Sequence, residues 1–82
     1  MTVVVESPGG MTWVGRYHER TERGVLLHDV ASFDPAATDE PRAAWIQRQI
    51  KFGVRADLRH FVVPTDQASR IVRLMDWESQ PL

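Results

Sequence analysis

Residues 60–74 contain a β-favouring run, a turn and a second alternating run, and they read His60-Phe61-Val62-Val63-Pro64-Thr65-Asp66-Gln67-Ala68-Ser69-Arg70-Ile71-Val72-Arg73-Leu74. Residues 61–63 favour a strand. Pro64 ends that strand because proline lacks the N–H that a central strand needs. The polar residues 65–67 suit a turn or a single 3₁₀ turn, and alternation resumes over residues 68–74. A strand, a one-turn corner and a second strand are typical of the end of a small closed barrel.

Three earlier runs also have the composition of strands. Residues 2–6 are mostly valine and too few for a helix, and residues 11–19 and 24–33 alternate between two faces, with turns at 7–10 and 21–24. Gly15 indicates a bulge or a bend where another backbone comes close. In the third run, alternation predicts one face made of Val25, Leu27, Asp29 and Ala31 and another made of Leu26, His28, Val30 and Ser32.

Residues 39–53 fit a helix and a strand almost equally well. Asp39-Glu40-Pro41 has the composition of an N-cap with an acidic residue and a proline in the first helical turn, and Gly53 suits a helix end. Apolar residues at 43, 46 and 50 share a helical face. However, residues 44–54 also alternate in the manner of a strand.

The spacing of these elements predicts a single mainly β domain. Roughly five or six short strands, with turns every eight to twelve residues, are typical of an all-β barrel or sandwich. The 82 residues are too few for a two-sheet sandwich. We therefore expect one small barrel over residues 1–76, with a short helix or a further strand around 39–51 and a C-terminal tail over 77–82.

Three segments resemble strands of the SH3-like and Sm-like small barrels: Trp13-Val14-Gly15-Arg16-Tyr17, Gly24-Val25-Leu26-Leu27-His28-Asp29-Val30, and Phe61-Val62-Val63-Pro64 through Ile71. The first resembles the bent second strand, the second the strand that follows, and the third the closing strands. The hairpin at 18–23 lacks the Asp and Asn of the first Sm RNA-binding loop, and Pro64-Thr65-Asp66 stands where the second loop has Arg-Gly. The acidic and aromatic groove of peptide-binding SH3 domains is also not evident. The resemblance therefore implies a fold and transfers no binding site.

Composition narrows the class of protein. The chain has no cysteine, which excludes disulfides and thiolate chemistry and favours the cytoplasm. No apolar run approaches the length of a membrane span, and the N-terminus does not have the pattern of a signal peptide. The net charge of −1 is unevenly divided, because residues 1–41 carry three Arg against seven acidic residues and residues 42–82 carry six Arg and Lys51 against four. Such asymmetry suits a basic binding face or self-complementary association.

Basic and aromatic residues of the second half supply the candidate interaction site. Guanidinium groups bind phosphates and aromatic faces stack on bases, while Trp is enriched at protein interfaces and also common in small cores. The candidates are Trp45, Arg48, Lys51, Phe52, Arg55, Arg59, Arg70, Arg73 and Trp77. For Trp45 and Trp77, the core and the interface remain equal alternatives.

Catalysis and metal binding have weak support in the sequence. No serine lies in a nucleophile elbow, and a barrel of this size leaves little room for a deep cleft. His18, His28 and His60 are metal-ligand types, and the first two suit pairing across a hairpin, but their spacing matches no metal motif. We expect exposed strand histidines, no catalytic residues and no cofactor.

These observations predict a non-enzymatic protein-interaction or assembly module. Exposed strand edges and the opposite charges of the two halves favour self-association, or binding to another protein, and no membrane partner is expected. The first alternative is an Sm-like nucleic-acid-binding protein that uses the Arg-rich half. The second alternative is a small-molecule or metal-binding domain.

Overall fold

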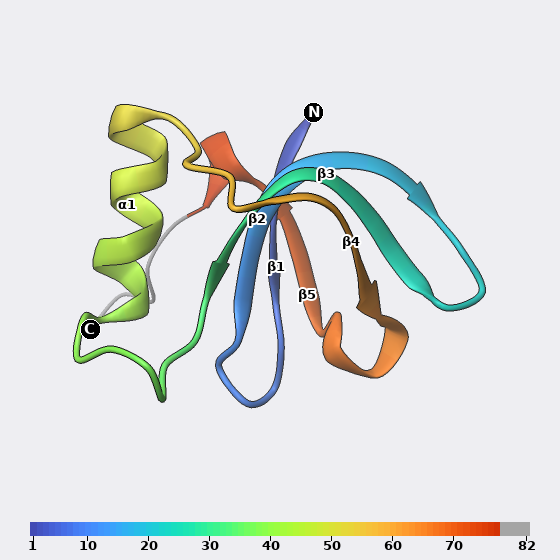
Figure 1. Cartoon of the computed structure of the whole chain (residues 1–82), viewed down its shortest axis with the longest axis horizontal. Coiled ribbons are helices and arrows are strands. Elements are labelled where there is room, and N and C mark those ends of the chain that lie inside the picture. The colour runs from blue at the N-terminus through green and yellow to red at the C-terminus, as the bar shows by residue number, and fades with distance from the viewer. Residues whose placement is uncertain (78–82) are drawn as a thin grey trace.

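The computed structural model describes residues 1–77, which form one five-stranded antiparallel sheet and one α-helix (Figure 1). The elements in chain order are β1 (Thr2–Glu6), β2 (Thr12–Arg20), β3 (Gly24–Phe33), α1 (Arg42–Phe52), β4 (Leu58–Pro64), the 3₁₀ turn η1 (Thr65–Gln67), β5 (Arg70–Arg73) and the 3₁₀ turn η2 (Leu74–Asp76). The strands lie in the order β4-β3-β2-β1-β5, and every neighbouring pair is antiparallel. The mainly β class predicted from the sequence is confirmed.

The sheet ends in β4 and β5, which do not pair with each other within the described residues. Figure 1 shows β2 and β3 curving strongly, so that the sheet bends around its own interior. Pro64 is the last residue of β4, and η1 follows at once, as the sequence predicted. β4 begins at Leu58, three residues before the predicted run, because it pairs with β3 as far as Val30.

Both faces of β1 are buried, which explains its unbroken run of valines. Val3 and Val5 face the interior of the bent sheet, where the cluster comprises Val3, Val5, Trp13, Val25, Leu27, Val30 and Val63. Val4 faces the other side, where α1 covers a cluster comprising Val4, Val14, Ala31, Phe33, Trp45, Ile46, Leu74 and Trp77. Trp13 therefore belongs to the core, and its ring stacks on Phe61 with centroids 5.6 Å apart.

A β-bulge lies opposite Gly15, because the β2–β3 register shifts between Val14 and Arg16 and two residues of β3, Asp29 and Val30, face Gly15 alone. A Cβ added at Gly15 would lie 3.1 Å from the carbonyl oxygen of His28, which confirms the close approach of another backbone. On β3 the bulge places Asp29 at a φ of 53°, a conformation that Asp tolerates better than most residues. The simple alternation predicted for residues 24–33 is therefore wrong beyond Asp29, because the extra residue exchanges the faces that follow it.

Residues 42–52 form a helix, which settles the ambiguity of this segment. Ile46 is buried against the sheet, and residues 43 and 50 pack beside it, as the helical face predicted. The predicted start is wrong by a few residues, because Pro41 occupies the N-cap without a side-chain cap and the first turn contains no acidic residue. Glu40 instead precedes the helix, and its carboxylate pairs with Arg48 of α1.

The predicted tail began at Trp77, but this residue is buried with the cluster under α1. The domain therefore extends at least one residue further than the predicted boundary at 76. The rest of the predicted tail, 78–82, lies outside the described residues. Within residues 1–77, no helix combines the length and the apolar character that crossing a membrane requires.

Candidate functional site

Trp45 and Trp77, the two tryptophans proposed as contacts, are core residues of this chain. Trp45 is only 8% exposed, and its ring centroid lies 5.4 Å from that of Phe33. Trp77 belongs to the same buried cluster. Of the two alternatives that the sequence left open, the structure supports the core for both residues.

Carboxylates engage three of the candidate arginines. The ion pairs are Arg48 with Glu40 at 2.6 Å, Arg70 with Glu6 at 3.0 Å and Arg73 with Asp76 at 2.6 Å. Arg48 donates two hydrogen bonds to Glu40, and these bonds hold the pKa of that carboxyl below its ordinary value. The charge on these three arginines is therefore partly neutralised within the chain itself.

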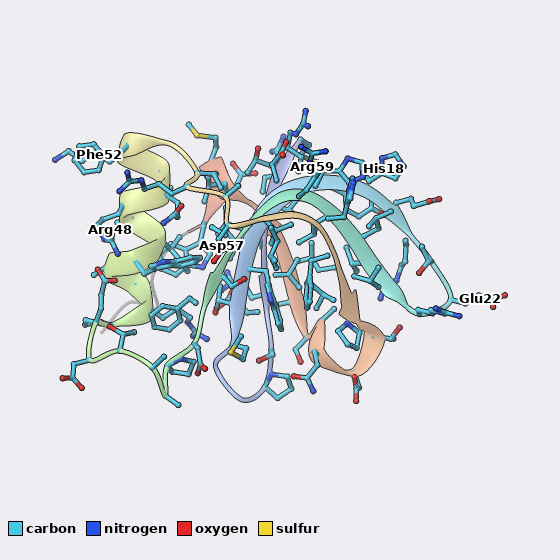
Figure 2. All side chains as sticks on the ribbon, in the orientation of Figure 1. His18, Glu22, Arg48, Phe52, Asp57 and Arg59 are labelled. Carbon is cyan, nitrogen blue, oxygen red and sulfur yellow. The ribbon has the colours of Figure 1, made fainter. Side chains whose placement is uncertain are left out.

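The candidate basic residues do not form one continuous face. Figure 2 shows Arg48 on α1 at one side of the molecule and Arg59 above the sheet, well away from it. Lys51, Arg55 and Arg59 make no ion pair with another residue of the described part. The prediction from the sequence therefore grouped basic residues that the fold places on different parts of the surface.

One exposed aromatic residue does lie among cations, at the C-terminal end of α1. Phe52 is 72% exposed and points into solvent (Figure 2), with the Nζ of Lys51 5.4 Å from its ring centroid. Arg48, Gln49, Phe52 and Arg55 line a shallow hollow of about 290 Å³. The buried Gln49 holds the following loop in place, because its Oε1 accepts a hydrogen bond from the Arg55 N–H.

Exposed apolar side chains lie beside both ends of the sheet. Leu58, at the start of β4, is 40% exposed, and Met75, directly after β5, is 82% exposed. Near β5, a hollow of about 400 Å³ is lined by Met1, Thr2, Arg73, Leu74, Met75 and Asp76. These apolar residues were not predicted, because sequence alone does not show which strands lie at the edges of a sheet.

The three histidines gather on the exposed face of β2, β3 and β4. The rings of His18 and His28 stack with centroids 4.5 Å apart, and His60 meets His28 edge-on at 4.7 Å. Arg16 on β2 and His60 on β4 both pair with His28 on β3. Strand pairing therefore places Arg16, His28 and His60 side by side. Arg16 also forms an ion pair with Asp29 at 2.7 Å. Within the described residues, no group of three or more His, Asp or Glu side chains is arranged to hold a metal ion.

The lowered pKa of His28 predicts that the stability of the chain depends on pH. Desolvation lowers the pKa of His28 from 6.5, as do the charges of His18, His60 and Arg16, while Asp29 opposes them. The unfolded chain then binds more protons than the folded chain as pH falls through 6.5, so the free energy of unfolding decreases. We expect the melting temperature to fall between pH 7.5 and pH 5.5, by differential scanning calorimetry, and the fall to be smaller in His28→Gln. An identical slope in both proteins would contradict this account.

No protein-family model, no curated protein and no solved structure matches this chain.

Proposed function

We propose that this chain is a non-enzymatic assembly module, built as a small SH3-like or Sm-like barrel, that associates with copies of itself. The single observation that carries the proposal is the open sheet, whose end strands β4 and β5 are both unpaired on their outer sides within the described residues. An unpaired edge offers a row of N–H and C=O groups to another strand. Cytoplasmic location remains a prediction from composition.

If β4 of one copy pairs head-to-tail with β5 of the next, the unpaired N–H and C=O groups of both edge strands gain hydrogen-bond partners. Such a heterologous contact repeats around a ring or along a filament, depending on the rotation between copies. Seven residues of β4 and four of β5 are available for it. The strand order and the 3₁₀ corner between β4 and β5 also support the proposed barrel type.

The apolar side chains beside the edges give this contact a source of free energy. Leu58 lies in the edge strand β4, and Met75 lies in η2, which directly follows the edge strand β5. Burial of exposed apolar area contributes about 25 cal/mol per Å². An interface of this kind responds weakly to salt, unlike one made of phosphate contacts.

Nucleic-acid binding is the second candidate, and one observation favours it. Lys51, Phe52 and Arg55 combine cations with an exposed ring at the end of α1, which is the combination that stacks and neutralises single-stranded nucleic acid. The separation of the other cations and their pairing with carboxylates rank this candidate below self-association.

Self-association is tested by size-exclusion chromatography with multi-angle light scattering at low and high salt, with absorbance read at 260 and 280 nm. We expect an oligomer free of nucleic acid at both salt concentrations. Leu58→Lys and Met75→Lys place a charge in the proposed contact, so each is expected to raise the dissociation constant by about tenfold or more.

Phe52→Lys is the matched control, because it introduces the same charge at an exposed apolar position on α1, which is in neither end strand of the sheet. A monomeric parent protein, or dissociation caused by Phe52→Lys alone, would overturn the edge contact. A species that carries nucleic acid and releases it in high salt would favour the second candidate instead.

A further inference from the structure

A polar hollow of about 330 Å³ lies where the β1–β2 turn, the start of α1 and the start of β5 meet. Figure 1 shows the first turn of α1 and the β1–β2 turn at the same end of the molecule. The lining residues are Glu6, Ser7, Pro8, Arg42, Ser69, Arg70 and Trp77. We call this site the Glu6 hollow. It is separate from the apolar residues Leu58 and Met75 on which the proposed self-association depends.

Positive charge exceeds negative charge in the Glu6 hollow. The carboxylate of Glu6 is buried and pairs with Arg42 at 3.3 Å and with Arg70 at 3.0 Å, so two cations face one anion. Each guanidinium has five N–H donors, and Arg70 donates only one hydrogen bond to Glu6. Arg42 also begins α1, whose N-terminus carries partial positive charge, has no side-chain cap and contains no acidic residue in its first turn.

Two of the residues that line the hollow carry a buried polar atom with no hydrogen-bond partner in the described part of the chain. The two atoms are the Oγ of Ser7 and the Nε1 of Trp77, and these residues are only 6% and 7% exposed. An unpartnered buried polar group is costly, and most such groups in proteins are satisfied. The indole N–H can only donate, and the serine hydroxyl can donate. The indole N–H therefore requires a hydrogen-bond acceptor, and the serine hydroxyl can donate to the same kind of group.

We propose that the Glu6 hollow binds an oxyanionic group, a phosphate or a carboxylate, carried by a small ligand. Arg42 and Arg70 supply charge and free N–H donors, while Ser7 and Trp77 donate the two hydrogen bonds that are otherwise unmade. Glu6 holds the two guanidinium groups in place and leaves one net positive charge. The volume exceeds that of the oxyanion itself, so the ligand has a body beyond its charged group.

The test uses inorganic phosphate and acetate as probes, each compared with sodium chloride at equal ionic strength. Thermal unfolding of the full chain is followed at each concentration. We expect a rise in melting temperature that continues with the logarithm of the probe concentration, about 6–11 °C at tenfold excess over Kd, with at least one of the two probes and not with chloride. The probe that gives the larger rise identifies phosphate or carboxylate as the preferred group.

Variants separate binding from folding. Trp77→Phe keeps an aromatic core side chain but removes the N–H, and Arg70→Gln removes one cation; each is expected to reduce the rise at least threefold. Ser7→Ala should also reduce it, without lowering the melting temperature in chloride, because it deletes a buried group that has no partner. Arg48→Gln is the control, since Arg48 pairs with Glu40 away from the hollow.

Three outcomes would overturn the proposal. One is an equal rise with chloride, which would show a general effect of salt. Another is an undiminished rise in both Trp77→Phe and Arg70→Gln. The third is a clear loss of melting temperature in chloride for Ser7→Ala, which would show that a structural water already satisfies this hydroxyl. Because Arg70 also belongs to the edge strand β5, all variants are compared at the same low protein concentration, where self-association contributes little to the melting temperature.

Discussion

Gly24→Ala is expected to lower the melting temperature by about 12 °C or more. Gly24 has a φ of 151°, where side chains are strained, and an added Cβ would overlap the carbonyl oxygen of Val63 and lie 3.0 Å from the Cα of Pro64. The obstacle is backbone, so no side-chain rotation relieves it. The residue also pairs with Pro64 at the end of the β3–β4 ladder. We expect a loss of about 3 kcal/mol or more, from a total near 5 kcal/mol for a domain of this size.

The measurement is far-ultraviolet circular dichroism during thermal and urea unfolding. Gly9→Ala is the matched control, because a Cβ there meets nothing within 4 Å, and its melting temperature should stay close to that of the parent. If Gly24→Ala also melted within two or three degrees of the parent, roughly a 0.5 kcal/mol change, the tight approach of β3 to β4 would be wrong.

Trp45→Ala is expected to cost about 3–5 kcal/mol of the free energy of unfolding, the range for truncating a large buried aromatic residue. Trp45 is the main aromatic contact of α1 with the sheet, packed on Phe33 and beside Ile46. Its removal leaves a cavity between helix and sheet that neighbouring side chains fill only in part. Urea unfolding monitored by circular dichroism gives the loss directly.

Phe52→Ala on the same helix is the control for Trp45→Ala, because Phe52 is exposed and surface substitutions usually change stability by less than about 0.5 kcal/mol. The oligomeric state of the same two variants should be measured by size-exclusion chromatography with multi-angle light scattering. If Trp45→Ala retained its stability but lost self-association, Trp45 would be an interface anchor rather than a core residue.

The proposed self-association predicts that stability depends on protein concentration. Association of folded copies stabilises the folded state by mass action, so the melting temperature should rise with protein concentration if the chain self-associates. The two substitutions above should therefore be measured at the lowest practical concentration, where their effects on the single chain are not masked by association.

Local sequence was sufficient to predict most of the strands and the 3₁₀ corner between β4 and β5. Three local features predicted the structure correctly: the valine run near the N-terminus, the strand end at Pro64 and the polar turn after it. They could do so because strand propensity and turn chemistry depend on only a few neighbouring residues. Gly15 was also interpretable as a bulge, since a strand glycine usually marks one. These features needed no knowledge of what lies across the sheet.

Tertiary structure decided what local pattern left open. Residues 42–52 have both periodicities, and the helix forms because the outer face of the sheet offers an apolar surface for Ile46 to cover. The bulge at Asp29 exchanges the faces of the residues after it, which alternation cannot foresee. The histidine cluster joins residues from three separate segments, and the Glu6 hollow joins residues from four. The sequence by itself determined the elements, while long-range strand pairing and the docking of α1 decided which side chains meet, because contacts between distant residues depend on register and burial rather than on local preference.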